Sequence, residues 1–181
     1  MQEPILVHPP LAALQRKPWR GHAWRAHWRI YEATDHGGSL RSSGRYHRGP
    51  DRYPEEQTWA ALYLALSPEA SLGEILRRLS PELLHHLNNY RLSELDVQLN
   101  AVLDCRDAEA LGLTADDLLR GYDFTITQEL GAAAVAVGAE GILVPSATRL
   151  GDNLVVFPTQ LQTASKLTVV GSRDPRLYVP R

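Results

Sequence analysis

The stretch Leu62-Tyr-Leu-Ala-Leu-Ser-Pro-Glu-Ala-Ser-Leu-Gly-Glu74 decides the fold, because it predicts a strand that runs directly into a helix. Leucine alternates with alanine or tyrosine in its first half, which is the two-residue period of a strand. Ser67 predicts an N-cap and Pro68 the first helical position. Apolar residues then recur at helical spacing, and Glu74 lies on the flank of that stripe. Tyr63 from the strand and Glu74 from the helix can therefore face one cleft.

The chain before this unit predicts an extended arm and one strand. Four prolines within the first 18 residues disfavour a helix, so we assign residues 1–23 to an N-terminal arm and 24–181 to the domain. Residues 24–33 are rich in aromatic and branched side chains and predict the first strand. Residues 48–57 contain a glycine and two prolines and predict an exposed loop beside a pocket.

The chain after this unit mixes strands and helices without regular alternation. Thr114 predicts the cap of a short helix, and a polar glycine-containing turn predicts a hairpin between two apolar runs. We therefore expect an α+β fold with mostly antiparallel strands. The predicted elements are strands at 91–99, 102–105, 142–144, 154–157 and 166–170, and helices at 82–87, 115–120 and 126–137.

Composition limits the function classes. The 181 residues suit one domain with a sizeable core. The net charge of −2 provides no basic field for nucleic acid, and no apolar run reaches membrane-spanning length. The single cysteine, Cys105, cannot form an internal disulfide, and the N-terminus lacks a signal-peptide pattern. These features predict a cytoplasmic protein that binds neither membrane nor nucleic acid directly.

Motifs of several enzyme classes are missing from the sequence. It has no glycine-rich phosphate loop and no G-x-S-x-G nucleophile elbow. Its seven histidines form no H-E-x-x-H motif, and the neighbours His85 and His86 point different ways on a helix. We therefore expect no bound metal and no resident cofactor.

The order of short motifs resembles that of the RES domain family, the toxins of bacterial RES–Xre toxin–antitoxin pairs. The match spans roughly residues 24 to 171. The family often has Gly-Arg-Trp-Asn where this chain has Gly44-Arg45-Tyr46-His47. The matching pieces are Trp28-Arg29-Ile30-Tyr31, Gly44-Arg45-Tyr46, Leu62-Tyr63-Leu64-Ala65 with Glu74, Gly141-Ile142-Leu143-Val144-Pro145-Ser146 and Asn153-Leu154-Val155-Val156-Phe157.

The resemblance implies an ADP-ribosyltransferase-like fold, with a split, mostly antiparallel sheet flanked by helices, and an activity on NAD. NAD and inorganic phosphate would then be substrates. The implied partner is an antitoxin with an Xre-like helix-turn-helix domain, and a homodimer within that complex is left open. The implied catalytic residues are Arg29, Tyr63, Glu74 and Ser146, and the implied NAD-binding residues are Arg29, Arg45, Tyr46, Tyr63, Ser146 and Asn153.

Glu74 also has an ordinary structural interpretation. Arg77 and Arg78 follow it by three and four residues, which is the spacing of an ion pair on a helix surface. The functional interpretation is a carboxylate beside the nicotinamide ribose, where it would favour the oxocarbenium-like state formed as the glycosidic bond breaks.

The other candidates leave similar alternatives open. Arg29 and Arg45 fit surface ion pairs, or a pyrophosphate or phosphate bound by the planar guanidinium. Tyr63, flanked by alanines, fits an ordinary strand position or a ring that stacks on nicotinamide. Ser146 fits a turn, or a hydroxyl that binds phosphate or ribose. Asn153 fits a hairpin turn better than a ligand contact.

We therefore predict a toxin with NAD phosphorylase activity, which cleaves NAD to nicotinamide and ADP-ribose 1″-phosphate. The first alternative is a transferase or glycohydrolase that passes ADP-ribose to a protein or to water. The alternative from another class is a non-catalytic protein whose pocket only binds its partner.

Overall fold

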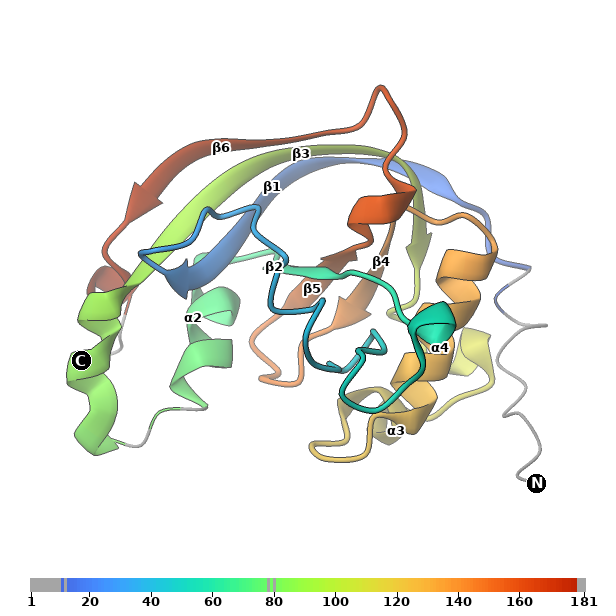
Figure 1. Cartoon of the computed structure of the whole chain (residues 1–181), viewed down its shortest axis with the longest axis horizontal. Helices are drawn as coiled ribbons and strands as arrows, with labels where there is room; N and C mark the ends of the chain where they lie inside the picture. Colours follow the sequence, from blue (N-terminus) through green and yellow to red (C-terminus); the bar gives the residue numbers. More distant parts are fainter. Residues whose placement is uncertain (1–10, 12, 78, 80, 179–181) are drawn as a thin grey trace.

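The computed structural model describes residues 11, 13–77, 79 and 81–178 (Figure 1). The strands are β1 (Lys17–Trp28), β2 (Leu62–Ala65), β3 (Tyr90–Asp104), β4 (Gly141–Pro145), β5 (Asp152–Val156) and β6 (Lys166–Arg173). The α-helices are α2 (Pro68–Leu76), α3 (Ala115–Leu119) and α4 (Thr125–Ala136). Short 3₁₀ helices are η1 (Glu55–Gln57), η2 (Pro81–Asn89), η3 (Glu109–Leu111), η4 (Pro158–Gln160) and η5 (Pro175–Tyr178).

The six strands form one sheet that closes on itself. Its order is β1-β2-β5-β4-β3-β6, and β1 also pairs with β3. The pairing of β1 with β3 is long, whereas β1 meets β2 at one residue pair, Trp24 and Ala65. The pairing of β3 with β4 is parallel and the others are antiparallel. In Figure 1, β1, β3 and β6 arch over β2, β4 and β5. The mixed fold with a mostly antiparallel sheet agrees with the prediction.

Two hydrophobic clusters follow from the alternation along β2. Leu62 and Leu64 are buried with the inner side chains of β1 and β3, such as Leu95 and Val97. Tyr63 points the other way and packs against the second cluster, which is formed largely by side chains of α4 and by Ile142, Val144 and Val155 of β4 and β5. Side chains of successive strand residues point to opposite faces, so one four-residue strand supplies both clusters.

The predicted strand–helix unit is confirmed. The Ser67 hydroxyl accepts a hydrogen bond from the Ala70 N–H at 3.1 Å, and Pro68 is the first residue of α2. Thr114 forms a capping box with Asp117 at the start of α3. The predicted hairpin is β4 and β5, paired antiparallel. The sequence predicts these elements correctly because each depends on residues that are close together in the chain.

The first strand differs from the prediction. It runs from Lys17 to Trp28, not from 24 to 33, so residues 17–23 of the predicted arm are paired with β3. The prediction assigned these residues to the arm because of the nearby prolines. Pro18 lies at the register irregularity between Lys17 and Trp19, where a strand tolerates a missing N–H. The earlier part of the arm lies mostly outside the described residues.

β3 is one continuous strand, although its sequence predicts two. On one edge, β6 pairs with it as far as Gln98 and β4 pairs with it from Val102. The carboxylate of Glu140 fills the gap, because its Oε2 accepts hydrogen bonds from the backbone N–H groups of Asn100 and Ala101. A buried side chain thus replaces a strand neighbour.

No helix among the described residues has the length and apolar character that a membrane span requires.

Candidate active site

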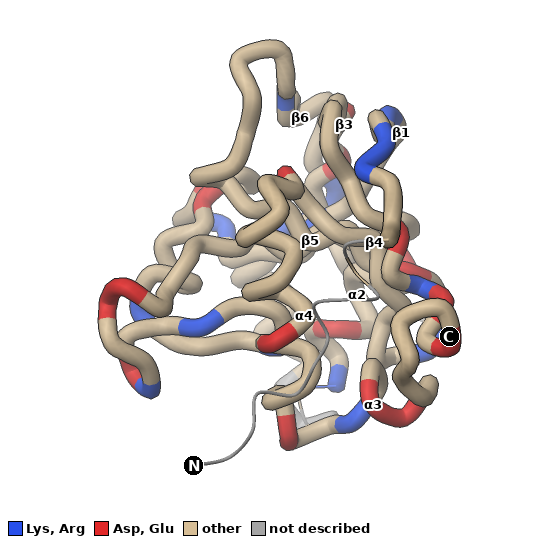
Figure 2. The backbone as a smooth tube through the Cα atoms, turned by 90° about the vertical axis from the view of Figure 1, so that its right-hand side faces the viewer, with Lys and Arg blue, Asp and Glu red and all other residues tan. Residues whose placement is uncertain are grey.

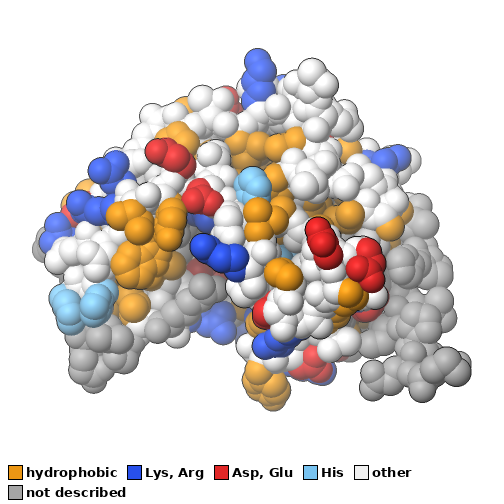
Figure 3. All heavy atoms as spheres, in the orientation of Figure 1, with side chains coloured by type: hydrophobic (Ala, Val, Ile, Leu, Met, Phe, Trp, Pro, Cys, Tyr) orange, Lys and Arg blue, Asp and Glu red, His pale blue; other side chains and the backbone are white. Residues whose placement is uncertain are grey.

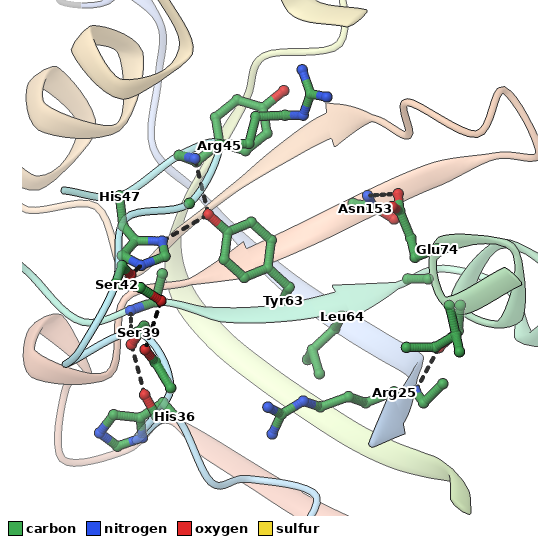
Figure 4. Close-up of a pocket in the computed structure, with 18 of the residues that line it drawn as sticks. Arg25, His36, Ser39, Ser42, Arg45, His47, Tyr63, Leu64, Glu74 and Asn153 are labelled. Atoms are coloured by element: carbon green, nitrogen blue, oxygen red, sulfur yellow. Dashed lines mark hydrogen bonds between the residues drawn. The ribbon is translucent and has the colours of Figure 1, made fainter. Parts of the chain in front are cut away.

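A cavity of about 590 Å³ lies between β1, β2, α2 and the loop of residues 36–47. Its volume is in the range of small-molecule binding sites. Figure 4 shows the ring of Tyr63 in the middle of the site, with Arg45 and His47 on one side and Glu74 and Asn153 on the other. Four residues predicted from sequence to bind NAD therefore line this cavity: Arg45, Tyr46, Tyr63 and Asn153. Glu74, predicted to be catalytic, lines it as well.

Glu74 is held in place by two side chains from the β4–β5 hairpin. Its Oε1 accepts hydrogen bonds from the Ser146 hydroxyl at 2.9 Å and from Asn153 Nδ2 at 3.3 Å. No ion pair of Glu74 is present among the described residues, which include Arg77 but not Arg78. Its Oε2 has no hydrogen bond from any described residue.

A glycine in α2 lies close to the turn of the β4–β5 hairpin. Gly73 precedes Glu74, and a Cβ at this position would lie 2.8 Å from Leu150 Cδ1 and 3.3 Å from Thr148 Cγ2. Leu150 Cδ1 is the end of an exposed, flexible side chain, so a larger residue at 73 would displace this side chain and tighten the contact with Thr148. The small residue at 73 therefore suits the close packing of α2 against the turn.

Ser146 is buried and does not line the cavity. Besides its bond to Glu74, its hydroxyl oxygen accepts the Thr148 N–H at 3.2 Å and lies 2.7 Å from the Thr148 hydroxyl. Its place behind the carboxylate differs from the predicted contact with phosphate or ribose. The geometry fits a residue that orients Glu74.

In the part of the chain that the structure describes, three arginines bring positive charge to the cavity: Arg25 from β1, Arg45 from the loop and Arg77 at the end of α2. The Arg45 guanidinium donates to the backbone carbonyls of Leu118 and Arg120 and lies 4.7 Å from the Phe124 ring centroid. Burial lowers its pKa, although an arginine remains protonated in proteins. Because its partners here are carbonyls and a ring, its charge is not neutralised by them.

Arg29, the first arginine chosen from the sequence, lies outside the cavity. It follows the end of β1, is exposed, and its Nε donates to the Tyr90 carbonyl at 3.2 Å. The arginine that lines the cavity is Arg25, which donates to the Ala33 carbonyl at 2.7 Å. The sequence contains Trp-Arg three times, at 19–20, 24–25 and 28–29. The prediction chose Arg29 because Trp28-Arg29-Ile30-Tyr31 is the piece that resembles the family motif.

His47 and Tyr63 form a pair that the sequence did not suggest. The Tyr63 hydroxyl lies 2.9 Å from His47 Nδ1 and accepts the Tyr46 N–H at 2.9 Å. Gly44 permits this packing, because a Cβ there would lie 2.5 Å from His47 Cε1 and 2.9 Å from the Tyr63 oxygen. The carbonyl of Gly44 is in turn held by Gln128 of α4 at 2.9 Å.

Two buried polar atoms beside the cavity lack a hydrogen-bond partner among the described residues: the Tyr46 hydroxyl and Asn153 Oδ1. Burial raises the pKa of Tyr46, so this phenol stays neutral. Buried polar atoms are normally satisfied by protein, water or ligand. Asn153 is a candidate to accept a hydrogen bond from a bound molecule.

The surface around the site is mixed. In the view of Figure 2, acidic and basic residues are scattered along the described backbone, in keeping with the small net charge. On the face shown in Figure 3, hydrophobic side chains gather over the end of β1, where Trp28, Ile30 and Tyr31 are exposed. Among the described residues, no group of three or more His, Cys, Asp or Glu side chains is arranged to hold a metal ion.

Comparisons with known proteins point to one family. The family model described as RES domain matches residues 17–179. Among solved structures, a chain in the crystal structure of the M. tuberculosis MbcT–MbcA toxin–antitoxin complex is similar, with a TM-score of 0.80 and 30% sequence identity. The similarity covers 95% of this chain and 94% of that chain. No curated protein matches the sequence.

Proposed function

Because the chain belongs to the RES domain family, we propose that it is the toxin of a toxin–antitoxin pair and that it degrades NAD in the cavity around Tyr63. One observation carries the proposal: among the described residues, one fixed carboxylate, Glu74, shares a cavity with three arginines. Cleavage of NAD needs both kinds of charge, since a cationic ribose forms next to an anionic pyrophosphate.

Glu74 is the proposed group at the reacting carbon. As the bond to nicotinamide breaks, its electron pair passes to the pyridinium nitrogen and positive charge develops on the ribose. A carboxylate beside the ribose stabilises that charge. Ser146 and Asn153 hold one oxygen of Glu74, which directs the other to the substrate. Tyr63 offers its ring for stacking on nicotinamide.

Arg25, Arg45 and Arg77 are the proposed anion-binding groups, and Arg25 replaces Arg29 in this role. A guanidinium suits phosphate groups because its planar donors bind two oxygens at once. Two charges balance the pyrophosphate of NAD, and the third leaves room for one more anion. For that reason phosphorolysis is the preferred reaction: a phosphate oxygen bonds to the ribose carbon that nicotinamide leaves, giving ADP-ribose 1″-phosphate.

The same site would serve transfer of ADP-ribose to a protein or to water, which differ from phosphorolysis only in the acceptor. No separate observation favours them. The proposed fold relationship, an ADP-ribosyltransferase-like split sheet, applies equally to all three reactions.

The proposed partner is an antitoxin with an Xre-like helix-turn-helix domain. Support comes from the similar chain, which was solved in a toxin–antitoxin complex. The exposed hydrophobic side chains at the end of β1 are of the kind that protein partners cover. The proposed site of action is the cytoplasm, where both NAD and phosphate are available as substrates.

Product analysis tests the proposal. Purified protein is incubated with NAD at several phosphate concentrations, and nicotinamide and the ADP-ribose product are separated. We expect NAD loss that saturates with phosphate and a phosphorylated ADP-ribose formed in step with nicotinamide. Free ADP-ribose or a labelled protein would instead identify water or protein as acceptor. If no NAD is lost under any condition, the protein is a non-catalytic binding partner.

A further inference from the structure

In the described loop of residues 36–47, both ring nitrogens of His47 have a hydrogen-bond partner. His47 is buried, with 4% of its surface exposed. Its Nε2 lies 2.7 Å from the Ser42 carbonyl oxygen, and its Nδ1 lies 2.9 Å from the Tyr63 hydroxyl. A carbonyl can only accept, so the proton of the neutral ring must be on Nε2. Nδ1 then carries a lone pair, and the Tyr63 hydroxyl donates to it.

The Tyr63 oxygen therefore has a defined polarity. It accepts the backbone N–H of Tyr46 at 2.9 Å and gives its proton to His47. If Nδ1 becomes protonated, two N–H groups point at the same oxygen. The hydroxyl can then no longer donate its proton to His47, and the proton must turn away from both N–H groups. One protonation thus reverses the hydrogen bond that orients the ring in the middle of the cavity.

We propose that His47 is a positioning residue for Tyr63, and that its neutral Nε2–H form holds the phenol in the orientation that the substrate requires. The proposal goes beyond the assignment of Tyr63, because it makes the activity depend on the protonation of a residue that does not itself react. It rests on the proposed function only where activity is the readout.

The groups around His47 set the pH at which the change occurs. Burial lowers the pKa of His47, while the Ser42 carbonyl and the negative charge of Asp51 act to raise it. Asp51 stays ionised because the hydroxyl and N–H of Ser43 bind it and lower its pKa. Tyr63 faces the ring from β2, and His36 lines the same cavity from the loop. His47 is therefore neutral at neutral pH and gains its proton below the ordinary range for histidine.

The matched variants are His47→Asn and His47→Ala. An asparagine amide can accept the Tyr63 proton through its oxygen but does not titrate, whereas alanine removes the hydrogen bond from Tyr63 to residue 47. In the wild type, we expect kcat/KM for NAD to fall about tenfold per pH unit below the pKa of His47. We expect His47→Asn to keep activity at neutral pH within about threefold and to lose this acidic limb. His47→Ala should lose about tenfold at all pH values.

Nitrogen NMR of labelled histidine supplies a readout that needs no activity. The His47 ring should show a protonated Nε2 and an unprotonated Nδ1 at neutral pH, and it should titrate within about one pH unit of the midpoint of the acidic limb. A protonated Nδ1 at neutral pH would overturn the proposal even if NAD is consumed. An acidic limb that persists in His47→Asn would overturn it as well. Absence of NAD turnover, with the expected tautomer present, would instead count against the proposed function alone.

Discussion

Glu74→Gln removes the one charge that the proposed mechanism places beside the ribose and changes little else. The glutamine carbonyl oxygen can still accept the hydrogen bonds from Ser146 and Asn153 that Oε1 accepts in the native protein. The fold should therefore survive, and the effect on turnover should report the charge.

The size of the effect follows from Coulomb's law. With the ribose cation about 4.5 Å from the carboxylate and an effective dielectric constant of about 20, the interaction is worth about 3 to 4 kcal/mol. Because about 1.4 kcal/mol corresponds to a factor of ten in rate, kcat should fall by about 10² to 10³. The KM for NAD should change much less, since the full charge exists only in the transition state.

The assay is the initial rate of nicotinamide release at saturating phosphate, with circular dichroism and a urea titration to verify folding. Glu69→Gln is the matched control, because Glu69 is exposed in the first turn of the same helix. A folded Glu74→Gln protein that retains more than about a tenth of the wild-type kcat would refute the electrostatic role. Glu74 would then serve only to join α2 to the hairpin.

Three other outcomes are expected. Arg25→Gln should raise the KM for NAD by about tenfold or more, whereas Arg29→Gln, at an exposed position, should leave the KM unchanged. Steady-state kinetics of the two variants tests whether Arg25, which lines the cavity, or Arg29, which the sequence predicted, binds NAD. Glu140→Gln should cost about 1 to 3 kcal/mol of unfolding free energy in urea, because in either orientation the amide nitrogen of glutamine would face at least one backbone N–H donor. Burial acts to raise the pKa of Glu140, but the hydrogen bonds that its carboxylate accepts from Gln162, Ser165, Asn100 and Ala101 outweigh burial and lower the pKa. The carboxylate therefore stabilises the fold fully above about pH 4.3, and this stabilisation is lost as the pH falls through the folded-state pKa. The difference in unfolding free energy between wild type and variant should thus shrink in acid. Cys105→Ser should leave kcat unchanged, because burial raises the pKa of this thiol to about 12 and keeps it from acting as a thiolate; a folded but inactive variant would reveal an unrecognised nucleophile.

Local sequence rules were sufficient for the elements that hold Glu74, the proposed catalytic carboxylate. Ser67 and Pro68 start α2, and alternation along β2 sends Tyr63 to one face and the leucines to the other. The spacing of Glu74 on the flank of its helix then leads to the same cavity that Tyr63 lines. These predictions succeeded because caps, alternation and helical periodicity depend on residues within a few positions of each other.

The tertiary structure alone decided that Arg25, and not Arg29, reaches the cavity. Trp24-Arg25 and Trp28-Arg29 have the same local pattern, and only the length of the pairing with β3 places Arg25 in the site and Arg29 beyond it. The four prolines predicted an arm that lies outside the domain, yet a register irregularity opposite β3 accommodates Pro18 within β1.

The buried polar contacts were likewise invisible in the sequence. Glu140 fills a gap in the sheet edge between β6 and β4, and His47 meets Tyr63 sixteen positions along the chain. Nothing near these residues in sequence distinguishes them from a surface glutamate or a loop histidine. Both side chains are buried, and a buried polar group without a hydrogen bond costs free energy, so each needs a partner. Only the closed sheet brings those partners within hydrogen-bonding distance. The sequence by itself therefore determined the strand–helix unit and its carboxylate, and the packing of distant segments determined which cations and which hydrogen-bond partners surround it.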